Sequence, residues 1–199
     1  MTAPWRLEYA VLASSAQDGD TMRVSNIRDF AWTSETTAIP RYYDAAFNLN
    51  EVKGVDLVMS YWAGDEIAHV FVSLTFDDGR HLAVSVKTRR AAGQDSSTLG
   101  GFFRNYELIY VIADERDLIG VRTDMWRERV YIYPLQTTPG TPRLLAKTPH
   151  FYNTLTDNCT SNVASRIAAM SGSGGGLRYI WKLLVERLYG FLCVWPWSA

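Results

Sequence analysis

The stretch HVFVSLTFDDGRHLAVSVKTR (69–89) decides the fold of this chain. It consists of two runs rich in β-branched and aromatic residues, joined by the turn residues DDG (77–79). An Asp-Gly pair between alternating hydrophobic residues is the strongest short-range signal for a β-hairpin. We therefore expect two adjacent antiparallel strands, one over 69–76 and one over 81–89.

Other runs of the sequence predict further strands on either side of this hairpin. The alternation of apolar and polar residues in 22–32, the short apolar run 55–62 and the β-rich run 128–135 are each typical of a strand. The run ELIYVIA (107–113) fits a strand or a buried helix equally well, because periodicity does not separate the two for so short a segment. The larger part of the chain is thus expected to form an antiparallel sheet.

The last part of the chain predicts helices. Apolar residues recur at helical spacing in CTSNVASRIAAM (159–170), and the Gly/Ser segment SGSGGG (171–176) interrupts this pattern. An amphipathic run with helical spacing follows it. We therefore predict an α+β fold with one domain over 1–170, followed by a linker and a C-terminal amphipathic segment over 171–199.

Composition and charge exclude several classes of protein. The chain has 199 residues, a net charge of −1 and 47% hydrophobic residues, which suits one domain with a full core. It lacks the basic run of a nucleic-acid-binding protein, so no nucleic acid is expected as a partner. Three histidines and two cysteines are dispersed along the chain, so we expect no metal, no cofactor and no disulfide framework. We also expect no transmembrane helix, and the first residues do not read as a signal peptide.

Cys159 is the first candidate for chemistry. It follows Asp157 and Asn158 and precedes Thr160, and three of these residue types are good helix N-caps, so a helix is expected to begin here. The positive end of a helix dipole lowers a thiol pKa and favours the nucleophilic thiolate. A small buried core residue is the alternative role for a free cysteine, and position alone does not choose between the two.

A base for this cysteine would be a histidine. His69 and His81 begin the two strands of the predicted hairpin, and His150 lies nine positions before Cys159. Most single histidines are surface or satisfied core residues, but two at the ends of one hairpin are less ordinary. The sequence does not fix the register that would place either of them beside Cys159.

Two further sets of residues have both a functional and a structural interpretation. Ser60 or Tyr61 could donate a hydrogen bond to an oxyanion, although a partly buried aromatic corner is the simpler account. The run ADER (113–116) is better interpreted as a capped helix start with an ion pair than as a cleft lining.

The chain resembles the Lnb N-terminal periplasmic domain family. The resemblance is carried by segments in the family's order over roughly 22–165: VSNIRDFAW, PRYYDAAFNLNEVKGVDLVMSYW, IAHVFVSLTFDDGRHLAVSVKTRR, GFFRNYELIYVIADERDLIGVRT, ERVYIYPL and FYNTLTDNCTSN. The family is similar to bacterial lipoprotein N-acyltransferases and to circularly permuted papain-like (NlpC-type) cysteine enzymes, with lecithin:retinol acyltransferase a more distant relative. The resemblance implies a permuted papain-like domain with the catalytic cysteine at a helix N-terminus.

The resemblance also implies roles for particular residues. His69 in IAHVFVSL matches the family histidine, Cys159 in LTDNCTSN matches the family cysteine, and Asn158 precedes that cysteine as in the relatives. A third polar residue that orients the imidazole would be His81 or Ser85.

Two departures from the family pattern accompany this match. Lys87 stands where the family usually has an acid, and the span from Tyr133 to Phe151 is shortened.

The function implied is thiol-mediated acyl transfer in the periplasm or cell envelope. The expected partners are a lipid acyl donor and a lipoprotein amine acceptor, and the C-terminal segment either packs on the domain or lies on a membrane surface. Two alternatives stay open. One is a cysteine peptidase or amidase that acts on peptide or cell-wall bonds, and the other is a catalytically impaired binding module of the same fold.

Overall fold

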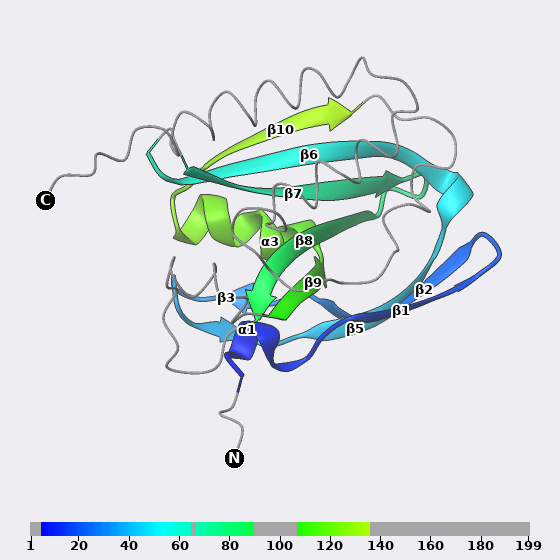
Figure 1. Ribbon diagram of the computed structural model, residues 1–199, viewed down its shortest axis with the longest axis horizontal. Helices are drawn as coiled ribbons and strands as arrows, with labels where there is room; N and C mark the ends of the chain where they lie inside the picture. Colours follow the sequence, from blue (N-terminus) through cyan, green and yellow to red (C-terminus); the bar gives the residue numbers. More distant parts are fainter. Residues whose placement is uncertain (1–4, 65–66, 90–106, 136–199) are drawn as a thin grey trace, which may run out of the picture.

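The computed structural model describes residues 5–64, 67–89 and 107–135 (Figure 1). Most of these residues form strands: β1 (Ser14–Asp18), β2 (Thr21–Arg28), β3 (Ala31–Trp32), β4 (Ala38–Ile39), β5 (Tyr42–Asn48), β6 (Val52–Ala63), β7 (Ile67–Phe76), β8 (His81–Arg89), β9 (Glu107–Ala113) and β10 (Arg129–Leu135). The helical turns among them are short: α1 (Leu7–Ala10), the 3₁₀ turn η1 (Leu49–Glu51), α3 (Glu115–Leu118) and the π-helical turn η2 (Val121–Met125). The structure agrees with an α+β fold dominated by sheet.

Eight strands form one mixed sheet. Seven of them follow the order β1-β2-β9-β8-β7-β6-β10. The eighth, β5, also pairs with β2. All pairings are antiparallel except that between β2 and β9, which is parallel and rests on Arg28 opposite Ala113. The sheet curves so strongly that β2 and β5 lie across from β6 and β7 (Figure 1).

The predicted hairpin is confirmed as β7 and β8. Val72 pairs with Val84 and Thr75 with His81, so His81 lies next to the turn and His69 lies far from it. Gly79 has a φ of +81°, a conformation that suits glycine because it has no Cβ. The amide of Gly79 donates to the carbonyl of Phe76 (3.0 Å), which closes the turn.

Both faces of the central strands are buried, which explains their nearly continuous apolar sequences. One face packs inside the curved sheet against β2 and β5, where the rings of Phe47 and Phe76 lie 4.7 Å apart. The other face carries a second cluster that includes Val58 and Phe71, and α1 and α3 contribute Tyr9 and Leu118 to it. Of the described candidate residues, Ser60, His69, His81 and Ser85 lie on this second face.

The other strand predictions are confirmed with two refinements. The runs 55–62 and 128–135 correspond to β6 and β10, and 107–113 is the strand β9 rather than a helix. The expected strand over 22–32 is wrong as one element, since it divides into β2 and β3. The division occurs at Phe30, because its amide donates to the Asp117 side chain (3.1 Å) rather than to a neighbouring strand.

Several predictions lie outside the described residues. These are the helix over 159–170, the linker over 171–176 and the C-terminal amphipathic segment. The domain division at 170 therefore stays a prediction, as do the papain-like permutation and the cysteine at a helix N-terminus.

Candidate functional site

His69 lies on β7 within the second buried face. Its backbone pairs with Ser60 of β6, and its ring stacks on Phe71, two residues along the same strand (5.7 Å between ring centres). The ring Nε2 shares a hydrogen bond of 2.7 Å with the hydroxyl of Ser85 on β8. This contact fixes the orientation of the imidazole.

The surroundings of His69 keep its ring uncharged. Burial lowers the pKa of His69 well below its ordinary value of 6.5, and the positive charges of Lys87 and Arg122 lower it further. A neutral imidazole is the form that can accept a proton from a nucleophile. The structure therefore presents His69 in the protonation state that a general base requires at neutral pH.

Ser60 is on the same face as His69 but has a partner of its own. Its side chain is fully buried and its hydroxyl donates to the carboxylate of Glu128. The same carboxylate accepts a hydrogen bond of 2.7 Å from Nη1 of Arg122. The Ser60 hydroxyl hydrogen therefore bonds to Glu128 and is not a free donor for an oxyanion. Ser60 instead stabilises this buried cluster.

Tyr61 is not beside His69. Successive residues of a strand point to opposite faces, so Tyr61 lies on the face away from Ser60. Its ring contacts Tyr131 of β10 (5.8 Å) and lies under the guanidinium of Arg129. This arrangement is the aromatic corner that the sequence favoured.

His81 belongs to a separate polar cluster at the turn end of the hairpin. Its Nδ1 lies 3.2 Å from the Thr75 hydroxyl and 3.6 Å from a carboxylate oxygen of Glu115. Glu115 also accepts a hydrogen bond from Ser73. Of the two candidates for a third polar residue, the structure therefore brings Ser85 to His69 and gives His81 other partners.

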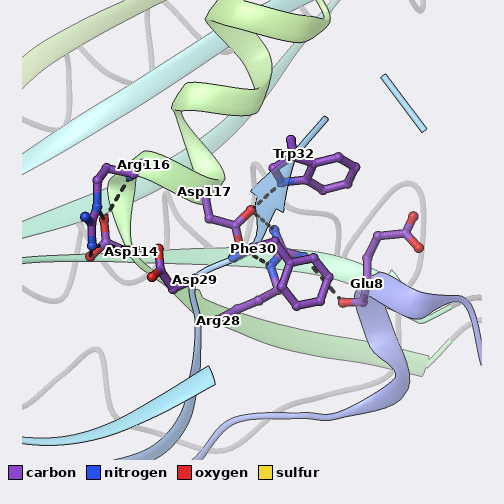
Figure 2. A network of polar contacts seen from close by, with 8 residues as sticks. All are labelled: Glu8, Arg28, Asp29, Phe30, Trp32, Asp114, Arg116 and Asp117. Carbon is purple, nitrogen blue, oxygen red and sulfur yellow. Dashed lines mark hydrogen bonds and ion pairs between the residues drawn. The ribbon is translucent and has the colours of Figure 1, made fainter. Parts of the chain in front are cut away.

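A buried ion pair that the sequence did not single out supports the site. Figure 2 shows Asp117 of α3 directed toward Arg28, Phe30 and Trp32. Asp117 is fully buried, and its carboxylate accepts from Arg28 Nε (2.6 Å), Arg28 Nη2 (3.1 Å) and Trp32 Nε1 (2.7 Å), besides the Phe30 amide. This network holds α3, and with it the following turn η2 that carries Arg122, against β2 and β3.

The sequence contained one signal for this network. Arg28 falls in the same alternation as the apolar residues Met22, Val24 and Phe30, so a charge occupies an expected core position. A buried charge requires a partner. The partner, Asp117, is 89 residues away, and only the fold identifies it. The pairing of Arg122 with Glu128 had no comparable signal.

The capped helix start predicted at 113–116 is confirmed. Asp114 is the N-cap of α3, and its side chain accepts from the Arg116 amide (3.0 Å). The Arg116 side chain forms the ion pair with Asp114 (3.0 Å).

Cys159 and Asn158 lie outside the described residues, so the structure gives no geometry between the thiol and His69. Within residues 5–64, 67–89 and 107–135, no three His, Cys, Asp or Glu side chains gather in the way a metal site requires. In the same ranges, no helix is both long and apolar enough to cross a membrane.

Comparison with known proteins gives one match. The model of the family described as the Lnb N-terminal periplasmic domain matches residues 38–187, which is well over half of the chain. That range includes His69, Ser85 and Arg122. No curated protein and no solved structure matches the chain.

Proposed function

This chain belongs to the Lnb N-terminal periplasmic domain family and is a periplasmic domain, and from that membership we propose that it is a cysteine-dependent acyltransferase. Cys159 is the nucleophile in this proposal and His69 is its base. The observation that carries the proposal is the state of His69, whose ring is neutral and fixed by the 2.7 Å contact to Ser85.

The proposed reaction has two half-reactions. In the first, His69 takes the thiol proton as Cys159 attacks an ester carbonyl of a lipid, and the resulting imidazolium returns the proton to the departing alcohol. A thioester between the acyl chain and Cys159 remains. In the second, an amine attacks the thioester, His69 accepts the amine proton, and the sulfur leaves and recovers that proton. The products are an amide and the free thiol.

Ser85 is a positioning residue in this proposal. It contacts the imidazole rather than the reacting atoms, and its hydroxyl holds one ring nitrogen so that the other is available. The lowered pKa of His69 leaves the ring unprotonated at neutral pH, so its nitrogen is able to accept the thiol proton, although as a weaker base than an ordinary imidazole.

Acyl transfer to the thiol is testable by mass spectrometry of the intact chain. Incubation with a diacyl phospholipid is expected to add the mass of one acyl chain to Cys159, and a lipid-modified peptide amine is expected to discharge it as an amide. His69→Gln is expected to slow adduct formation by about 10²–10⁴-fold, the usual contribution of general base catalysis.

His81→Gln is the matched control, because it alters the other histidine of the same hairpin. Its rate is expected to stay within about twofold of wild type. Equal losses in the two variants would contradict the assignment of His69, and a chain that forms no adduct while folded would favour the binding-module alternative.

A hydrolase is the second candidate, and the charged surroundings of His69 favour it. Lys87 and Arg122 lie close enough to perturb the His69 pKa, whereas a channel dedicated to acyl chains is expected to be apolar. Water would replace the amine in the second half-reaction. Release of free acid from the thioester at the same rate with and without the amine, or cleavage of short peptides, would select this alternative.

A further inference from the structure

A cavity of about 430 Å³ lies beside η2 on the same side of the molecule as His69's charged neighbours. Its size is within the range of small-molecule sites. The cationic and tryptophan side chains in its wall come from α1, β2, β3, β8, η2 and the residues flanking them: Arg6, Arg28, Lys87, Arg122, Trp32 and Trp126.

Two of the buried residues in this wall are arginines. Arg28 is 7% exposed and Arg122 is 2% exposed. The carboxylates that hold them, Asp117 and Glu128, are not part of the wall. The two glutamates that do line the cavity, Glu8 and Glu35, are half-buried and exposed respectively. The buried part of the wall therefore combines two arginines, whose counter-ions are not part of it, with the apolar side chains of Leu118 and Val121 and the ring of Tyr9.

Arg122 has an unused hydrogen-bond donor. Its Nη1 donates to Glu128, and its guanidinium lies 5.5 Å from the ring centre of Phe71 and 5.2 Å from that of Trp126. Its Nε is buried and has no hydrogen-bond partner. An unpaired N–H on a buried charge is unfavourable unless a ligand supplies the acceptor.

The electrostatics of the cavity also favour a bound anion. Burial lowers the pKa of Arg122, its ion pair with Glu128 raises it in part, and the charge of Arg28 lowers it again. The charges of Arg122 and Lys87 both act on His69. Positive charges that oppose one another in this way are stabilised by a bound anion.

We propose that this cavity binds a phosphate group, held by Arg122 and Lys87. Arginine forms charge-assisted hydrogen bonds to phosphate oxygens in a fixed geometry, and lysine adds a point charge. The volume exceeds that of a phosphate ion, so a phosphate ester with a small substituent fits, and Trp32 and Trp126 in the wall supply apolar surface for that substituent. The phosphate comes either from a lipid headgroup or from a soluble phosphate ester. This site does not depend on acyl transfer.

Calorimetric titration of the full chain at low ionic strength tests the proposal. The probes are glycerol 1-phosphate and dihexanoyl phosphatidylglycerol below its micelle concentration. Saturable binding with one site per chain is expected, weakening as salt is added. A lipid that binds at least tenfold more tightly than glycerol 1-phosphate identifies a headgroup site, and equal affinities identify a site for soluble phosphate esters.

Variants of the wall residues test whether the phosphate binds in this cavity. Arg122→Gln is expected to weaken binding by more than tenfold, and Lys87→Gln by at least threefold. Lys53→Gln is the matched control, since Lys53 is an exposed lysine paired with Asp77 and is absent from the cavity wall. It is expected to bind as wild type does.

Should Arg122→Gln fail to fold, Lys87→Gln and Arg6→Gln carry the test. The absence of saturable binding would overturn the proposal. Wild-type affinity in both Lys87→Gln and Arg6→Gln would overturn it as well.

Discussion

The two histidines of the β7–β8 hairpin look equivalent in the sequence and are different in the structure. His69 lies on the buried face, with Ser85 as its hydrogen-bond partner and a lowered pKa. His81 lies beside the turn, where its side chain is 42% exposed and contacts Thr75 and Glu115. The difference arises from distance to the turn, because the far end of the hairpin lies near Arg122 of η2. Burial therefore keeps one histidine uncharged and leaves the other a surface residue.

α3 contributes a carboxylate to each region. Asp117 is buried against Arg28 and supports the His69 side through η2, while Glu115 contacts His81 and Ser73. The two residues are one half-turn apart on the same four-residue helix. Substitutions at Asp117 and Glu115 therefore perturb the two regions separately.

The largest effect on stability is expected from Asp117→Ala. This change leaves the buried Arg28 without its partner and is expected to destabilise the fold by about 3–5 kcal/mol. Urea unfolding followed by circular dichroism measures it. Glu115→Gln, at the His81 end, is expected to cost less than about 1 kcal/mol because its interactions are partly exposed. Similar losses in both variants would mean that the two regions do not differ in burial as described.

A second prediction concerns how the stability of the fold depends on pH through His69. Because the pKa of His69 in the folded chain lies well below 6.5, the unfolded chain binds a proton there more readily than the folded chain does. The contribution of neutral His69 to stability is complete above about pH 6.5 and is lost as pH falls toward the lower folded pKa.

Unfolding free energies at about pH 7.5 and pH 5 test this linkage. Wild type is expected to lose more stability than His69→Gln over that interval. Lys87→Met removes a positive charge near His69, so it is expected to raise the pKa of His69, which a histidine-resolved NMR titration measures directly. An unchanged His69 titration in Lys87→Met would contradict the electrostatic account.

The smallest effect is expected at Ser85. Ser85→Ala removes one hydrogen bond, worth about 0.5–1.5 kcal/mol, and is expected to slow adduct formation on Cys159 by about 2–10-fold. Ser85→Thr retains the hydroxyl and is expected to recover most of the rate. A merely structural role would lower stability without moving the pH profile of the reaction, whereas a positioning role moves that profile. Thr75→Val, which removes the corresponding contact of His81, is expected to leave the rate unchanged.

The local features of this protein were predictable from the sequence. The β7–β8 hairpin follows from alternation and an Asp-Gly turn, since both depend only on neighbouring residues. The start of α3 follows from Asp114, whose side chain caps the next turn. The positions of β6 and β10 follow from runs of residues that favour strands. His69 was singled out through its resemblance to the family histidine, and its catalytic role stays a prediction.

Tertiary structure alone decided the rest, because the interactions concerned join distant parts of the chain. Whether 107–113 is strand or helix depended on pairing with β8, which supplies the hydrogen bonds. The strand β5 over 42–48 likewise forms only because β2 pairs with it. The choice of Ser85 over His81 depended on which end of the hairpin each occupies, since both lie on the same face of β8. A sequence specifies the type of each element through local contacts, whereas the partners of Arg28 and Arg122, and the cavity they line, exist only once the sheet has curved and brought those elements together.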